Sequence, residues 1–359
     1  MFGKMMNNYY YGKSGKGDYR KEDLPKNRWQ LFWEVLRTRL ASLCRLNLIA
    51  IAAWIPLFLV LVFSMSMVVE GLNNTAIYKD YLDLGTLPEN VPEEMVTRMD
   101  AAVVETFQGM KGSDAAATTE EKKEVADTAL ATYTLGILER MLLYLIPCIF
   151  ITGPVKAGLA YVTRNWARDE HAFVWSDFKD AMKANWKQAL GVSFITSLMP
   201  IIMWEAYRFY GQQSSQNVIF VVPQMLVILV GVVWALSCLF MYPLMVTYEM
   251  KFSQLLKNGV LLAIARLPQT VGVRLLLLVP ALLCAGAAML TFSPITVMVL
   301  GGYYFIIGFA MSRFIGASYT NAVFDKFINS RMEGVQVNRG LASPEEEDDD
   351  EAEEENDPQ

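Results

Sequence analysis

Histidine is almost absent from this chain of 359 residues, and its few cysteines are scattered. His171 is the one histidine, and no two cysteines form a Cys-x-x-Cys pair. Structural zinc sites draw their ligands mainly from these two residue types, so we expect no metal site. The cysteines stand singly in or beside apolar runs, where we expect them to be small packing residues: Cys44, Cys148, Cys238 and Cys284.

Charge is also missing from long stretches of the chain. Arg45 and Glu70 enclose twenty-four uncharged residues, and similar runs recur as far as Ser312. About 20 apolar residues are needed to cross roughly 30 Å of hydrocarbon. The sequence therefore predicts an all-α, polytopic membrane protein. Six spans are expected, at about 46–69, 138–161, 188–208, 218–247, 270–291 and 295–318, within a helical membrane domain over 29–323.

Lys and Arg gather in alternate connecting segments. Residues 1–45 carry ten, 161–187 carry five and 249–274 carry four, whereas the turns 211–217 and 291–294 carry none. Cytoplasmic loops are enriched in Lys and Arg, so both termini are expected in the cytoplasm. The first apolar run begins after residue 45 and is too long for a signal-peptide core, so span one is expected to be an uncleaved anchor.

Residues 70–133 predict a small extracytoplasmic helical insertion. The stretch 70–139 has fourteen acidic and five basic residues, and a segment of this size is translocated largely regardless of its charge. A helix is expected from Glu93 to Met110. Thr118 and Glu121 predict a capping box for a helix that continues into span two.

The two ends of the chain have compositions that do not favour a packed core. Residues 1–28 predict a flexible cytoplasmic head, and 324–359 a cytoplasmic tail that is acidic and disordered from 344.

Three segments that precede pairs of spans have the spacing of interfacial amphipathic helices: 29–43, 175–187 and 252–268. In 175–187 four apolar residues share one helical face, and three lysines form a basic flank. The apolar residues are Trp175, Phe178, Met182 and Trp186, and the lysines are Lys179, Lys183 and Lys187. Such a helix either lies at the lipid interface, with its cations near phosphates, or packs its apolar face against the bundle.

A longer motif runs from Gly153-Pro154-Val155-Lys156 through Tyr161-Val162-Thr163-Arg164 to Arg168-Asp169-Glu170, followed by Phe173, Trp175 and Phe178. This pattern resembles the YesL family of bacterial integral membrane proteins. The resemblance extends from Trp29 through span one, and from span two to Val323. It implies a bacterial cytoplasmic-membrane protein that is often encoded near carbohydrate-uptake systems and has no established activity. It supplies no catalytic residue, and residues 70–133 have no counterpart in the family.

The motif contains one unusual charge and a candidate kink. Lys156 falls inside span two, where a central lysine costs about 2.5–3.5 kcal/mol on insertion scales. It is expected to reach toward headgroups, with a polar cavity as the alternative. Gly153 and Pro154 permit a kink, because proline removes a backbone donor.

Four charged residues near the end of span two form a candidate contact site. Arg164 and Arg168 share a helical face, with Asp169 and Glu170 directly after them. They could clamp an anionic headgroup or a partner's carboxylate, or form local ion pairs. Farther along, Glu205 and Arg208 are spaced to pair on one helix.

No catalytic or cofactor motif is present in the sequence, so the expected function is non-enzymatic, without a cofactor or a nucleic-acid partner. The leading hypothesis is an accessory or scaffold protein linked to carbohydrate uptake or the cell envelope. Its expected partners are membrane lipids and a transporter or envelope protein. The alternatives are a solute transporter and a lipid-active interfacial enzyme.

Overall fold

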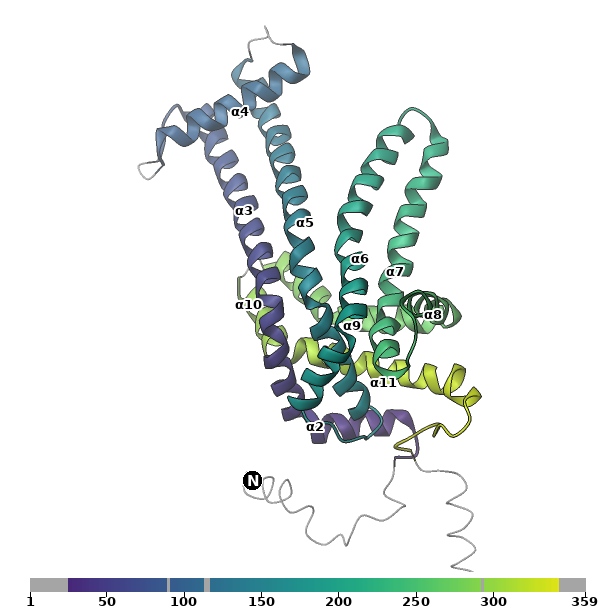
Figure 1. The fold of residues 1–359 in the computed structure, drawn as a ribbon. Helices are drawn as coiled ribbons and strands as arrows, with labels where there is room; N and C mark the ends of the chain where they lie inside the picture. Colours follow the sequence, from purple (N-terminus) through teal and green to yellow (C-terminus); the bar gives the residue numbers. More distant parts are fainter. Residues whose placement is uncertain (1–24, 89–90, 113–116, 292–293, 342–359) are drawn as a thin grey trace, which may run out of the picture. The chain divides into compact units, whose positions relative to one another are not determined.

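The computed structural model describes residues 25–88, 91–112, 117–291 and 294–341, and every regular element in them is helical (Figure 1). The all-α prediction is confirmed for these residues. Most of the predicted head and the acidic tail from 344 lie outside them. The chain forms two compact units: unit one is Met1–Ile51, Pro154–Ala189 and Val233–Gln359, and unit two is Ala52–Gly153 and Leu190–Val232.

Six helical segments of the described chain are long and apolar enough to cross a membrane, as predicted. Large apolar side chains on them remain exposed, including Val62, Val222 and Leu283, each at least 67% exposed. Lipid is the solvent that suits such surfaces. The chain is therefore a multi-pass membrane protein. The six segments are Arg28–Leu84, Thr119–Trp166, Ser176–Ser214, Val218–Thr247, Leu267–Cys284 and Met298–Arg331.

The helical segment that contains the first predicted span extends beyond residues 46–69 at both ends. Helix α2 (Arg28–Ile51) continues through a 3-10 turn (Ala52–Trp54) into α3 (Ile55–Leu84). Pro56 lies in the first turn of α3, where its missing N–H is tolerated. The helix ends at Gly85, whose φ of 67° suits a left-handed cap. The break thus follows proline chemistry, and α3 extends well past residue 69 into the predicted insertion.

In unit two, three helices pack around a small apolar cluster that includes Tyr78, Val103 and Phe107. They are α3, α4 (Glu93–Lys111) and the beginning of α5 (Thr119–Trp166). Asp100 of α4 accepts hydrogen bonds from Tyr78 Oη at 2.6 Å and Lys122 Nζ at 2.7 Å. This carboxylate therefore joins all three helices, and the predicted helix from Glu93 is confirmed.

The predicted capping box at the start of α5 is also present. The Glu121 carboxylate accepts from Thr118 N at 3.0 Å, and Glu121 N donates to Thr118 Oγ1 at 3.3 Å. These contacts satisfy backbone donors that the first turn leaves open. Helix α5 then continues into span two, as the sequence predicted, and ends at Trp166.

Unit two also contains the later part of α6 (Ser176–Ser214), a 3-10 turn (Val218–Phe220) and the start of α7 (Val221–Thr247). Arg208 of α6 forms its ion pair with Glu139 of α5. The predicted pairing of Arg208 with Glu205 is therefore replaced by a contact between helices.

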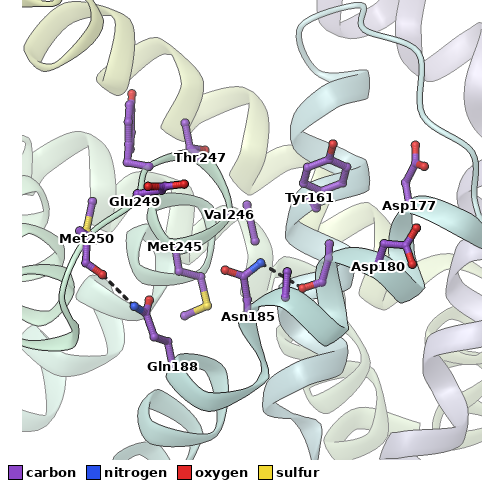
Figure 2. A pocket seen from close by; sticks show the side chains of 13 residues that line it. Tyr161, Asp177, Asp180, Asn185, Gln188, Met245, Val246, Thr247, Glu249 and Met250 are labelled. Carbon is purple, nitrogen blue, oxygen red and sulfur yellow. Dashed lines mark hydrogen bonds between the residues drawn. The ribbon is translucent and has the colours of Figure 1, made fainter.

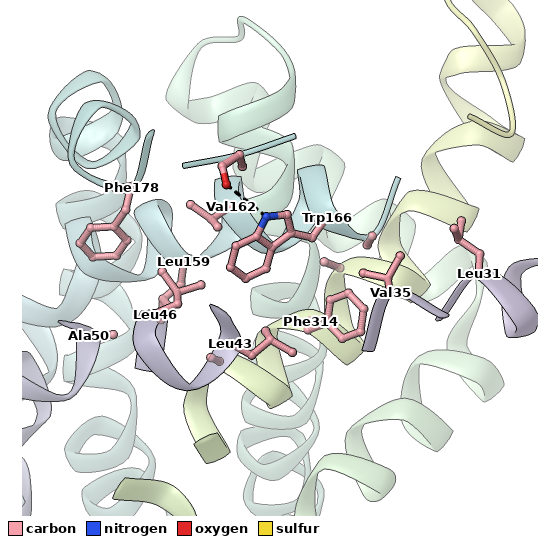
Figure 3. Close-up of a cluster of buried hydrophobic side chains, with 14 residues drawn as sticks. Leu31, Val35, Leu43, Leu46, Ala50, Leu159, Val162, Trp166, Phe178 and Phe314 are labelled. Atoms are coloured by element: carbon pink, nitrogen blue, oxygen red, sulfur yellow. Dashed lines mark hydrogen bonds between the residues drawn. The ribbon is translucent and has the colours of Figure 1, made fainter. Parts of the chain in front are cut away.

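Unit one continues α5, α6 and α7 with α2, α8 (Phe252–Ala265), α9 (Leu267–Thr291), α10 (Pro294–Tyr303) and α11 (Phe309–Phe327). A short 3-10 helix (Asn329–Arg331) follows. Trp166 is 1% exposed at the centre of its core, near Leu43 and Phe314 (Figure 3). The indole N–H of Trp166 donates to the carbonyl oxygen of Ala172 at 3.3 Å, so the buried ring has its polar atom satisfied.

A π-helical turn, Tyr304–Gly308, joins α10 to α11 and depends on one residue of α2. Asn47 is fully buried, and its amide Nδ2 donates to the carbonyl oxygens of Tyr304 and Phe305 at 2.9 and 2.8 Å. Its Oδ1 accepts from Ala310 N at 3.0 Å. Asn47 therefore supplies partners for backbone groups at the irregular turn.

Helices α5 and α6 approach closely at Gly158. A Cβ atom at this position would lie 2.7 Å from a ring carbon of Phe178 and 2.8 Å from the Phe178 carbonyl oxygen. We expect Gly158→Ala to lower the free energy of unfolding by about 1–3 kcal/mol, because the backbone must move. Unfolding in detergent measures this loss.

Gly136→Ala on the same helix is the matched control, since the nearest atom to its added Cβ would be 3.7 Å away. We expect Gly136→Ala to be neutral or stabilising by roughly 0.5–1 kcal/mol, as for any helical glycine. Equal destabilisation by both substitutions would contradict the close approach at Gly158.

Candidate functional site

An open pocket of about 680 Å³ lies in unit one, between α6 and the segment that follows α7 (Figure 2). Three carboxylates line it, and no lysine or arginine does. We call it the acidic pocket. Its lining residues are Tyr161, Asp177, Asp180, Ala181, Ala184, Asn185, Gln188 and the run 245–250.

One wall of the acidic pocket is a single face of α6. Asp177, Asp180, Ala184 and Gln188 recur at spacings of three and four, which places them on the same side of the helix. Asp177 also stabilises the start of the helix, because its carboxylate reaches back and accepts from Phe173 N at 2.9 Å, as the acidic member of a capping box does. Asp180 is exposed. The wall therefore has one carboxylate committed to the helix start and another facing solvent.

The opposite wall comes from the end of α7 and the residues after it. Gln188 Nε2 donates to the carbonyl oxygen of Met250 at 2.8 Å and links the two walls. Tyr248 donates to Asn329 Oδ1 at 2.6 Å. Burial raises the pKa of Tyr248 to about 12, so its hydroxyl is neutral at physiological pH. Glu249 is exposed at the rim.

The carboxylates do not form a metal centre. In the described part of the chain, no three His, Cys, Asp or Glu side chains come together in a way that could hold an ion. The acidic pocket is thus a negatively charged surface with amide and hydroxyl groups, which suits hydrogen bonding to a cationic group.

Of the four charged residues predicted as a contact site, Arg164 and Arg168 form ion pairs with Glu170. The carboxylate of Glu170 lies 3.0 Å from Arg168 Nε, 4.0 Å from Arg164 Nη1 and 3.3 Å from Arg339 Nη1. The side chains of Arg164 and Arg168 are only 15% and 9% exposed. We call these four residues the Glu170 cluster. The two predicted arginines are turned inward, where they form ion pairs within unit one.

Asp169 stands apart from the Glu170 cluster. It has a left-handed backbone, with φ of 56°. Burial raises the pKa of its carboxyl despite the nearby Arg39 guanidinium. Asp169 therefore belongs to the turn after α5, with Arg39 and Glu34 as its charged neighbours.

Residues 135–205 match the family described as "Protein of unknown function, DUF624". This family includes YesL-type membrane proteins, in agreement with the resemblance of the motif. The match covers most of the α5–α6 hairpin, with Arg164, Arg168 and Glu170 and the α6 wall of the acidic pocket. No curated protein and no solved structure matches the chain.

Within the segment matched by DUF624, residues 175–187, predicted as a basic amphipathic helix, are partly buried and partly exposed. Phe178 is 3% exposed and packs in the core, with Met182 against it. Trp175 and Trp186 are 60% and 49% exposed. Lys183 and Lys187 are exposed and Lys179 is half-buried. The helix therefore packs through Phe178 and presents Trp175, Trp186 and two of its three lysines outward. A position of this face at the lipid interface stays a prediction.

Lys156, also within the DUF624 match, points into the protein and is only 7% exposed. Its Nζ lies 5.9 Å from the ring centroid of Tyr242 on α7. The adjoining Gly153 and Pro154 lie inside the continuous helix α5, and the boundary between the two units falls between them. A kink there stays a prediction.

Sequence reasoning missed several residues of the site. Asp180 and Gln188 had a usable signal, since they continue the α6 face begun by Asp177. Glu249 of the acidic pocket and Arg339 of the Glu170 cluster had no such signal in the sequence, because they come from segments far along the chain. Gly340 shows how the last segment is placed: its φ is 86°, and a Cβ there would lie 3.0 Å from the carbonyl oxygen of Arg168.

Proposed function

We propose that this chain is a non-enzymatic accessory protein of the bacterial cytoplasmic membrane, and that its acidic pocket docks a basic juxtamembrane segment of a partner membrane protein. The observation that carries the proposal is the charge of the pocket lining, with Asp177, Asp180 and Glu249 and no basic residue. The partner is proposed to be a transporter or envelope protein.

Orientation links the pocket to this class of partner. The pocket lies at the ends of α6 and α7 that adjoin the Lys/Arg-rich segments 161–187 and 249–274. By the positive-inside rule these ends are proposed to face the cytoplasm, together with both termini. Short cytoplasmic loops of other membrane proteins are also rich in Lys and Arg. An acidic pocket at this level is thus complementary to a neighbour's basic loop.

Other features support a binding role over the alternatives. The exposed Trp175, Trp186 and Lys183 suit the lipid interface and would hold α6, which forms one wall of the pocket, at headgroup level. A lipid-active enzyme would need several carboxylates that converge with Arg164 around a headgroup-sized pocket, whereas Arg164 pairs with the single carboxylate of Glu170 and does not line the acidic pocket. A transporter would need a polar cavity that reaches Lys156, and Lys156 does not line the acidic pocket. The proposed link to carbohydrate uptake rests on the YesL resemblance alone.

Quantitative copurification in mild detergent tests the proposal. We expect the wild type to recover one stoichiometric membrane partner, and Asp180→Asn/Glu249→Gln to recover at least tenfold less. These substitutions remove two exposed charges and keep the size of each side chain, and they leave the Asp177 cap intact. Binding of the wild type should weaken as salt rises, because exposed charge pairs are screened.

The matched control is Glu105→Gln/Glu333→Gln, which removes two exposed carboxylates that do not line the pocket. We expect it to recover the partner as the wild type does. Equal loss in both double variants would make the effect one of net charge. Failure of the wild type to recover any membrane protein would refute the docking role.

A further inference from the structure

Three cations from three helices of unit one contact α7. Lys156 of α5 and Arg313 of α11 lie over the same ring of Tyr242, with Nζ and Cζ at 5.9 and 5.2 Å from its centroid. Arg274 of α9 donates from its guanidinium to the carbonyl oxygen of Ala235. We call Lys156, Arg274 and Arg313 the cationic cluster.

The cationic cluster faces one stripe of α7. Ala235, Cys238 and Tyr242 are spaced by three and four residues and therefore share a helical face. The ring of Tyr242 is 2% exposed and Lys156 is 7% exposed. These helices belong to the apolar, membrane-spanning segments. Positive charge held in such surroundings is unfavourable and mutually repulsive, and it marks a functional position by default.

No carboxylate neutralises the two arginines within the described residues. The ion pairs found there join other side chains, and none includes Arg274 or Arg313. Arg274 is repelled by Arg313, and both arginines repel the ammonium group of Lys156. The Nε of Arg274 is buried, with no hydrogen-bond partner in the described part of the chain. The two arginines thus have no carboxylate partner among the described residues, and Arg274 keeps an unused donor.

We propose that the cationic cluster binds a phosphate-type oxyanion, either a free phosphate or the phosphate of an anionic lipid headgroup. Guanidinium groups hold phosphate through paired N–H donors, and a lysine adds a point charge. The Tyr242 ring stacks against two of the cations and keeps them together. This site shares no residue with the acidic pocket and has the opposite charge, so either proposal can fail without the other.

Thermal unfolding of the purified full chain in neutral detergent tests the site. One arm adds inorganic phosphate against chloride at equal ionic strength, and the other adds phosphatidylglycerol against phosphatidylcholine. We expect phosphate or phosphatidylglycerol to raise the midpoint by several degrees, since a ligand of the folded state stabilises it. A phosphate response identifies a free anion, and a response to phosphatidylglycerol alone identifies the headgroup. No response in either arm overturns the proposal.

Variants localise the response. Arg313→Gln and Arg274→Gln are expected to weaken binding at least tenfold, whereas Arg37→Gln, at an exposed site outside the cluster, keeps wild-type binding. Equal weakening in all three would show only general attraction of anions. Without added anion, Arg313→Gln should unfold no lower than the wild type, because it relieves repulsion. A lower midpoint would mean that the protein already neutralises Arg313, and would overturn the site.

Discussion

Replacing Glu170 by glutamine is expected to lower the free energy of unfolding by about 2–4 kcal/mol, since removing one partner of a buried ion pair typically costs about 3–5 kcal/mol and these groups keep slight solvent contact. Glu170 is the shared carboxylate of Arg164, Arg168 and Arg339. Glutamine keeps the size of the side chain and removes its charge. Arg164 and Arg168 would then stay mostly buried without their carboxylate. Reversible unfolding by SDS in mixed micelles measures the loss.

Two substitutions separate the shared carboxylate from a general charge effect. Glu333→Gln removes an exposed carboxylate and is expected to change stability by less than about 0.5 kcal/mol. Arg339→Ala removes the half-exposed member of the Glu170 cluster and is expected to cost less than about 1 kcal/mol. If Glu170→Gln were as mild as Glu333→Gln, Glu170 would not hold the end of α5.

Asn47→Leu is the second substitution with a large expected effect. Leucine has a similar volume to asparagine but lacks the amide group, so the π-helical turn loses the two hydrogen bonds donated by Asn47 Nδ2 and the one accepted by Asn47 Oδ1. Each lost hydrogen bond costs about 0.6–1.5 kcal/mol in such settings, so we expect a total loss of about 2–4 kcal/mol. Hydrogen–deuterium exchange should rise at Ala310, whose N–H loses its acceptor.

Ser66→Ala on α3 is the control for Asn47. Ser66 is exposed and its hydroxyl donates only to its own helix, at Phe63 O, 2.8 Å away. We expect little change in stability or in exchange at Ala310. An Asn47→Leu protein with wild-type exchange at Ala310 would show that the π-helical turn is stable without the Asn47 amide.

Local chemistry made several elements predictable from the sequence. Charge-free runs gave the six candidate spans, and the Thr118–Glu121 capping box gave the start of α5. The break between α2 and α3 had a signal in Pro56 that the charge pattern obscured. Each of these features depends on residues within one or two helical turns.

Contacts between distant segments were not predictable in the same way. Arg208 had a carboxylate at helical spacing, Glu205, yet pairs with Glu139 on another helix. Arg339 reaches Glu170 from far along the chain, and Glu249 completes the acidic pocket from beyond α7. A single sequence carries no register between helices, so it gives the charges but not their partners.

The most direct test of the docking role is a photo-crosslinking residue at Ala184, which lines the acidic pocket, compared with one at Lys183, which is exposed on the neighbouring helix surface. The crosslinked peptide is identified by mass spectrometry in intact membranes. We predict that Ala184 captures one membrane protein at a loop rich in Lys and Arg, and that Lys183 captures mainly lipid. Capture of lipid alone from both positions would contradict the docking role.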